Sequence, residues 1–183
     1  ELGRILVEDG EDLQTALGYF QQACEEDPQN VDAHAKIGDI FLAHDQLDQA
    51  VNSYSEALNI APDSAWILTN RGVAYEFMSQ LPEAIADYSR AIELEPTAID
   101  ARRNRAGVYT QQAEYDKAIA DYSEGIALDP EFADLYIGRA GAYTGLGDIA
   151  SLKAAVADCD KSIALEPDSF YAFSARGYAS QQL

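Results

Sequence analysis

The stretch Ala86-Asp87-Tyr88-Ser89-Arg90-Ala91-Ile92-Glu93-Leu94-Glu95-Pro96 occurs three times in the chain with small changes. It returns over residues 120–130 and again over residues 157–167, and both copies end in proline. The prolines belong to a longer series with spacings of 34, 34, 34 and 37 residues: Pro28, Pro62, Pro96, Pro130 and Pro167. A fixed period of this size indicates that every unit has the same local structure and that the units stack on one another.

A unit of this length has room for two helices of about 12 to 14 residues and two short turns. Within each unit the apolar residues recur three and four positions apart, which is typical of helices rather than strands. Each proline lies where the second helix has to end, because its ring cannot continue the helical hydrogen bonding and biases the preceding residue away from helical geometry. The sequence therefore predicts an all-α fold.

The charge balance restricts the kinds of partner. The chain carries 32 acidic and 12 basic residues, a formal net charge of −20. Nucleic acids and anionic membrane surfaces are bound by clustered lysine and arginine, so both are disfavoured. No apolar segment reaches the roughly 18 to 20 residues of a membrane-spanning helix, so no direct membrane insertion is expected. The acidity fits a highly soluble exterior, a basic partner or adaptation to high salt.

The sequence contains no recognisable catalytic or metal-binding motif. Cys24 and Cys159 are far apart in sequence, and His34 and His44 have no cysteine nearby. Gly145-Leu146-Gly147-Asp148 is similar to part of a phosphate-binding loop, but no strand precedes it and the full glycine fingerprint is absent. The sequence thus predicts a protein that is not an enzyme, with no metal site and no cofactor.

The repeated positions identify a family. In the unit over residues 65–98 they are Leu68, Arg71, Gly72, Tyr75, Ala84, Tyr88, Ala91 and Pro96. The other units carry similar residues at equivalent positions, although the last full unit has three extra residues and carries Cys159 and Ser162 in place of the tyrosine and the last alanine. This pattern resembles the tetratricopeptide repeat family, in which a large residue, Leu-Gly, an aromatic, Ala, an aromatic, Ala and Pro follow at fixed distances.

The resemblance implies an α-solenoid of stacked antiparallel helix pairs, a right-handed superhelix of about 11 helices. We expect one continuous array over residues 1–183, because the proline spacing leaves no room for a linker. Its parts are a partial first repeat at 1–30, full repeats at 31–64, 65–98, 99–132 and 133–169, and a terminal helix of a partial or capping repeat at 170–183. In the last full repeat, three extra residues between Asp148 and Lys153 most simply lengthen the second helix.

A permanently charged residue lies on the packing face of several repeats. Equivalent positions read Ile37, Arg71, Arg105, Arg139 and Arg176, and a second set of equivalent positions reads Ser53, Asp87, Asp121 and Asp158. Arginine appears in the first set where aspartate appears in the second, which indicates ion pairs that offset the cost of burying a guanidinium. Each Arg could pair within its own repeat, with the preceding repeat, or with both; for Arg176 the preceding repeat offers Asp158.

A binding surface is implied by the resemblance, because in this family the first helices line the concave side of the superhelix. The predicted contact residues on this surface are Lys36, Trp66, Asn70, Val73, Arg103, Asn104 and Tyr171. Asn70 and Asn104 occupy equivalent positions one repeat apart, and an amide both donates and accepts, so the pair could hold the main chain of an extended peptide. The alternatives are ordinary solvent-facing polarity for the asparagines and a packing role for Trp66.

The sequence therefore predicts a non-catalytic protein–protein interaction module that binds a peptide or helical segment of a partner protein. A second hypothesis is a self-assembling scaffold, or a regulatory repeat domain of a larger protein, that uses its terminal helices. The chain begins at Glu1 rather than Met and shows no basic segment followed by an apolar one. A removed targeting segment is compatible with this, so the sequence leaves the compartment open, with the cytoplasm as the default expectation.

Overall fold

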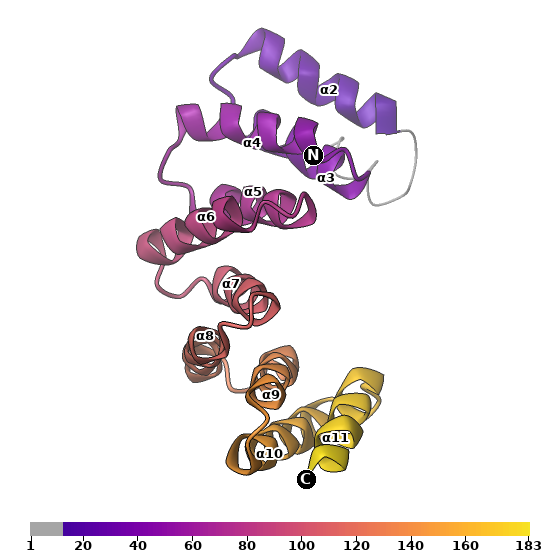
Figure 1. Ribbon diagram of the computed structural model, residues 1–183. Helices are drawn as coiled ribbons and strands as arrows, with labels where there is room; N and C mark the ends of the chain where they lie inside the picture. The colour runs from indigo at the N-terminus through magenta and orange to yellow at the C-terminus, as the bar shows by residue number, and fades with distance from the viewer. Residues whose placement is uncertain (1–12) are drawn as a thin grey trace. The chain divides into compact units, whose positions relative to one another are not determined.

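The computed structural model describes residues 13–183, which form ten α-helices and no strand. Contacts between residues divide the chain into two compact units, one ending at Pro96 and the other beginning at Thr97. The first unit contains α2 (Leu13–Glu26), α3 (Val31–Ala43), α4 (Leu47–Ile60), α5 (Ala65–Phe77) and α6 (Leu81–Leu94). The second unit contains α7 (Ile99–Gln111), α8 (Tyr115–Leu128), α9 (Ala133–Leu146), α10 (Ile149–Leu165) and α11 (Phe170–Gln182). Figure 1 shows consecutive helices running as antiparallel neighbours within each unit.

The predicted all-α repeat fold is confirmed, and so is the role of the prolines. The helices α2, α4, α6, α8 and α10 each end two residues before one of the five prolines. The residue between helix end and proline is extended at Glu95, which has φ −131° and ψ 91°, and at Asp129. An eleventh helix, expected within the partial first repeat, would fall on residues 1–12 and lies outside the described residues. One continuous array over the whole chain stays a prediction.

The turn between the two helices of a repeat contains a left-handed residue at the same position in all four full repeats. Asp45, Ser79 and Ala113 have φ of 58°, 59° and 59°, and Gly147 at the equivalent position has φ 75°. A left-handed residue at this point ends one helix and lets the chain reverse into the next. This turn accounts for the glycine-rich segment at 145–148: Gly147 caps α9, and the Asp148 carboxylate accepts hydrogen bonds from the backbone amides of Ala150 and Ser151 at the start of α10.

The helices of a repeat approach closely through small residues. Ala50, Ala84, Ala118 and Ala155 are fully buried on the second helices. A Cβ added at Gly38 would lie 2.7 Å from the ring of Tyr54, and one added at Gly72 would lie 2.6 Å from the ring of Tyr88. Each tyrosine thus fills the space that a missing side chain leaves on the facing helix.

Within each unit the first helices also contact one another. Helix α3 contacts α5, α7 contacts α9, and α9 contacts α11, whereas no comparable contact joins α4 to α6 or α8 to α10 in the described chain. Helices on the inside of a curved stack lie closer than those on the outside, so the first helices form the inner side of each unit. Helix α10 has 17 residues against 14 in α4, α6 and α8, so the three extra residues do lengthen the second helix.

Candidate functional site

The structure brings three of the arginines on the packing face together with aspartates of their own repeats. Arg71 donates from Nε to Asp87 Oδ2 at 2.7 Å and from Nη2 to Asp87 Oδ1 at 2.8 Å. Arg105 with Asp121 and Arg139 with Asp158 repeat this two-pronged geometry at 2.7 to 2.8 Å. The aspartates are buried, and the hydrogen bonds to them raise the pKa of each guanidinium. The pairs lie inside the helix packing, where each guanidinium is matched by a carboxylate.

In two of these ion pairs the arginine also donates a hydrogen bond to a serine of the preceding repeat. These serines were not predicted from the sequence. Arg71 Nη1 donates to Ser55 Oγ at 3.0 Å, and Arg139 Nη1 donates to Ser123 Oγ at 3.0 Å. Arg176 departs from the predicted alternatives, because it donates to Asp160 at 2.9 Å and not to Asp158. The Arg176 contact could have been predicted, because Ser55, Ser89, Ser123 and Asp160 occupy equivalent positions. Aspartate replaces serine at the position in the repeat that precedes Arg176.

In the first unit two of the predicted surface residues, Lys36 and Asn70, lie around one carboxylate. Asp39 on α3 accepts three hydrogen bonds, which define the Asp39 cluster of Asp39, Lys36, Tyr54 and Asn70. The Tyr54 hydroxyl and Asn70 Nδ2 both donate to Oδ1, at 2.8 and 3.0 Å, and Lys36 Nζ donates to Oδ2 at 2.7 Å. Burial and the adjacent Asp39 carboxylate raise the pKa of Tyr54, so its hydroxyl stays protonated and donates. Asp39 was not among the predicted site residues, since only the three-dimensional packing of α3, α4 and α5 shows its role.

Trp66 lies beside this cluster with part of its ring exposed. Its relative exposure is 44%, and Lys36 Nζ is 5.9 Å from the centre of its ring. Trp66 and Asn70 are four residues apart on α5 and therefore lie on the same side of the helix. Val73, also predicted for this surface, is half-buried. The first unit thus presents an indole, an oriented amide and a carboxylate along its first helices.

In the second unit Arg103 is surrounded by acidic and aromatic groups. Its guanidinium lies 3.5 Å from Asp100, 3.7 Å from Asp134 and over the ring of Phe132 at 5.5 Å. Arg103 Nη2 also approaches Asn104 Oδ1 at 3.4 Å. Asn104 therefore faces a cation, whereas Asn70 donates to a carboxylate. Tyr171 on α11 is 75% exposed and makes an edge contact with Phe170, whose ring centre is 6.0 Å away.

Two family models match the repeated part of the chain. The model described as TPR repeat matches residues 38–79 and 106–147, and the model described as tetratricopeptide repeat matches residues 65–98. The chain belongs to the tetratricopeptide repeat family. No curated protein matches the sequence of this tetratricopeptide repeat chain.

Several solved structures share the tetratricopeptide repeat fold of this chain. The crystal structure of MamA is 26% identical, with a TM-score of 0.81 over 91% of this chain and 95% of MamA. The first TPR of Spaghetti (RPAP3), bound to the HSP90 peptide SRMEEVD, is 26% identical, with a TM-score of 0.61 over 64% of this chain and 90% of that one. YrrB, described as a TPR protein with an unusual peptide-binding site, is 20% identical, with a TM-score of 0.78 over 96% of this chain and 88% of YrrB, which shows the fold alone.

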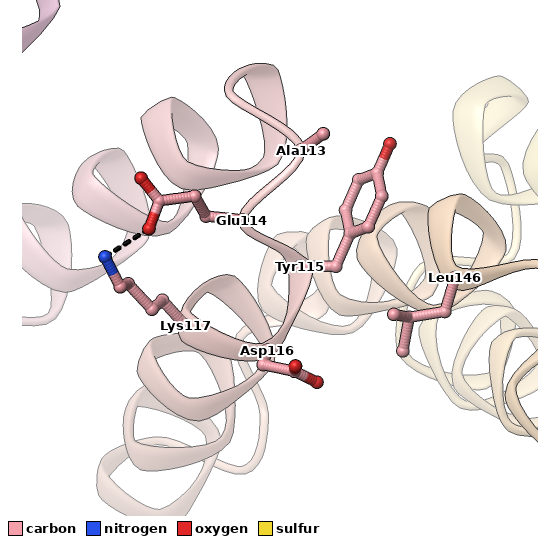
Figure 2. A pocket seen from close by; sticks show the side chains of 6 residues that line it. All are labelled: Ala113, Glu114, Tyr115, Asp116, Lys117 and Leu146. Atoms are coloured by element: carbon pink, nitrogen blue, oxygen red, sulfur yellow. Dashed lines mark ion pairs between the residues drawn. The ribbon is translucent and has the colours of Figure 1, made fainter.

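A small surface depression lies at the turn between α7 and α8 of this tetratricopeptide repeat protein. Figure 2 shows the Glu114–Lys117 ion pair on one side of it and Tyr115 and Leu146 on the other. Its volume is about 220 Å³, below the roughly 300 Å³ at which small-molecule pockets begin. Its lysine is already paired with the Glu114 carboxylate, so this lysine is not free to bind an anionic ligand.

In this tetratricopeptide repeat chain both histidines are paired with backbone carbonyls, and Cys159 is buried. His34 is paired with the carbonyl of Pro28 at 3.3 Å, and His44 with that of Ile40 at 2.9 Å. Cys159 is fully buried, and this burial with the adjacent Asp158 and Asp160 raises its pKa to about 11, which disfavours the reactive thiolate. Over residues 13–183, no three His, Cys, Asp or Glu side chains gather as a metal site requires, and no helix is both long and apolar enough to cross a bilayer.

Proposed function

We propose that this chain is a non-catalytic interaction module that binds a peptide or helical segment of a partner protein along its first helices. The observation that carries the proposal is the hydrogen bond from Asn70 to Asp39, made beside the exposed Trp66. A carboxylate only accepts, so the Asn70 amide must turn its NH₂ group toward Asp39. Its carbonyl oxygen and second N–H are thereby held in one orientation before any partner arrives.

An amide held in this way suits a peptide main chain, because it offers an acceptor and a donor at fixed positions and is indifferent to the side chains of the peptide. Trp66 supplies an apolar anchor, and a partly exposed indole next to polar groups is typical of residues that contribute most to binding. Tetratricopeptide repeats in Spaghetti and YrrB are described with peptides, which supports the general function.

The peptide class proposed for this chain differs from that in the Spaghetti complex. The HSP90 peptide SRMEEVD is acidic toward its C-terminus. Here Lys36 is neutralised by Asp39, and Arg103 lies between Asp100 and Asp134. Neither cation is available for a carboxylate without losing a partner it already has, so we propose a neutral or basic peptide.

The test is capture of partners from a peptide library by the wild type and by the Asn70→Ala/Asn104→Ala variant, with Trp66→Ala as a third protein. We expect both variants to lose most bound peptides. The matched control is Asn52→Ala/Asn59→Ala, which removes the same amides from exposed positions on α4, outside the proposed surface. If every captured peptide survives Asn70→Ala/Asn104→Ala, or if the control loses as many as the test variant, the proposed surface is wrong.

Self-assembly through the terminal helix is a second candidate function, favoured by the aromatic residues of α11. Phe170 and Tyr171 are each 75% exposed and Tyr178 is 58% exposed. Exposed aromatic groups that lie together favour association. Solution mass over a dilution series tests this: a dimer that Tyr178→Glu dissociates, and that Ser180→Glu on the same helix leaves intact, supports assembly. A monomer at every concentration contradicts it. A corresponding change at Leu2 lies outside the described residues.

A further inference from the structure

We propose that Lys36 occupies a site built for an arginine side chain of the partner, and that binding displaces it. This proposal rests on the proposed function and specifies the peptide class. One cation, the Lys36 ammonium, lies 2.7 Å from Asp39 Oδ2 and 5.9 Å from the Trp66 ring centre. A carboxylate and an aromatic face that share a cation are the two groups that bind a guanidinium from outside.

Of the two host groups, Asp39 is held in place by hydrogen bonds. Asp39 Oδ1 is fixed by hydrogen bonds from Tyr54 and Asn70, and the Tyr54 side chain is fully buried against Gly38. Trp66 lies at the start of α5 and keeps 44% of its surface exposed. Removal of Lys36 would therefore leave Asp39 Oδ2 in place and uncover the face of the Trp66 ring that Lys36 contacts.

Lys36 itself is weakly held. Its side chain is 41% exposed, and its ion pair with Asp39 joins residues three positions apart on one helix. Ion pairs of this kind contribute little to stability, because water screens them and a long side chain loses rotamer freedom in making them. Lys36 can thus move into solvent, and its departure exposes the carboxylate oxygen that it covered.

Arginine fits the vacated position better than lysine. Its guanidinium is planar, stacks on an indole and is less strongly hydrated than an ammonium. The surroundings favour a cation: between residues 13 and 96 there are 14 acidic residues against three basic ones. All three, Lys36, Arg71 and Arg90, are already in ion pairs with carboxylates of the same unit. An arriving arginine therefore meets excess negative charge and no free cation from this part of the chain.

Trp66 is the single tryptophan of the chain, so its fluorescence and its indole N–H resonance report on this site alone. The probe is the blocked tripeptide acetyl-Gly-Arg-Gly-amide, titrated against the wild type and Lys36→Ala. We expect Lys36→Ala to bind it about two- to fivefold more tightly, the size of an exposed cation–π contact that no longer competes. The same tripeptide with citrulline, which keeps the shape and loses the charge, should bind to neither protein.

Two further variants serve as controls for the gain in affinity. Asp39→Asn should abolish the gain in affinity for the arginine peptide, whereas Lys153→Ala, which removes an exposed lysine in the other unit, should leave the affinity unchanged. Equal or weaker binding by Lys36→Ala, or equal binding of the arginine and citrulline peptides, would overturn the proposal. Binding of library peptides that depends on Asn70 but not on arginine would reject this inference while the proposed function stood. Absence of any library peptide on the wild type would reject the proposed function itself.

Discussion

At the scale of single residues, Arg71, Arg105 and Arg139 show how a full charge is kept on a packing face. Each guanidinium meets both oxygens of a buried aspartate, so the charge that burial penalises is matched by an equal one at hydrogen-bond distance. The first full repeat solves the same packing problem without charge, because Ile37 and Ser53 occupy the equivalent positions. The chain thus contains both a charged and an uncharged solution at one structural position.

This natural alternative gives a prediction for the first unit. Arg71→Ile should destabilise the fold by about 3 kcal/mol, because it leaves the buried Asp87 without a partner, and Asp87→Ser should cost a similar amount. The double variant Arg71→Ile/Asp87→Ser copies the Ile37 and Ser53 arrangement and should recover at least about 2 kcal/mol of the summed loss. Urea unfolding followed by circular dichroism measures all three. The matched cycle on the exposed pair Arg90 and Asp63 should show almost no coupling, and strong coupling there would contradict the role given to burial.

Ser162 is a second residue-scale case, because its Oγ is buried and has no hydrogen-bond partner in the described structure. Equivalent positions carry Ala57 and Ala91, both fully buried, so the site accommodates alanine. Ser162→Ala should stabilise the protein by about 1 kcal/mol, since the folded state no longer holds an unsatisfied hydroxyl. The reverse change Ala91→Ser should destabilise by a comparable amount. A loss of stability in Ser162→Ala, measured by the midpoint of urea unfolding, would show that the hydroxyl has a partner after all.

At the scale of helices, the position of each tyrosine on a second helix depends on which facing residue is a glycine. Tyr54 and Tyr88 pack on Gly38 and Gly72 of their own repeats. The third full repeat has Ala106 in place of that glycine, and Tyr122 instead lies against Gly138 of α9, where an added Cβ would come within 2.4 Å of the ring. In the fourth full repeat Ala140 faces Cys159, a smaller side chain. Helix packing therefore depends on matched pairs of residues rather than on any one position.

Two glycines of α9 test this account. Gly138→Ala should destabilise by about 1 to 3 kcal/mol, because the new methyl group would overlap the buried Tyr122 ring and force it to shift. Gly141→Ala, three residues later on the same helix, has nothing within 4 Å of the new methyl group. It should stabilise by up to about 1 kcal/mol through higher helix propensity alone. Thermal and urea unfolding of the two variants should shift in opposite directions, and a shift in the same direction would contradict the packing described for Tyr122.

The helices also show which features a sequence can predict. The helix ends followed from proline spacing, because a proline acts on its own backbone and that of its neighbour. The turn at residues 145–148 also depends on local sequence, although its glycines are similar to part of a phosphate-binding loop. The role of Asp39 could not be predicted, since Asn70 reaches it from 31 residues away and Tyr54 from 15. Similarly, the Arg176 pairing with Asp160 depends on how α11 packs on α10.

At the scale of the whole molecule, the net charge of −20 is unevenly spread along the sequence. Residues 1–96 contain 19 acidic and four basic residues, and residues 97–183 contain 13 and eight. In both units arginines are paired with buried aspartates, and most of the remaining carboxylates lie at the surface. Such an excess attracts cationic partners and, through mutual repulsion, weakens the folded state.

Repulsion between the surface carboxylates makes the stability of the folded chain depend on salt. Raising NaCl from about 10 to 150 mM shortens the screening length from roughly 30 to 8 Å, so the midpoint of urea unfolding should rise. Salt also weakens the ion pairs, which would lower the stability of the fold. The buried arginine pairs, however, are screened much less than the exposed carboxylates. A variant with Glu25→Gln, Glu56→Gln, Glu83→Gln and Glu95→Gln, all exposed, should be more stable at low salt and respond less to NaCl. A midpoint that falls with salt would mean that exposed ion pairs, rather than net repulsion, dominate the electrostatic free energy of this chain.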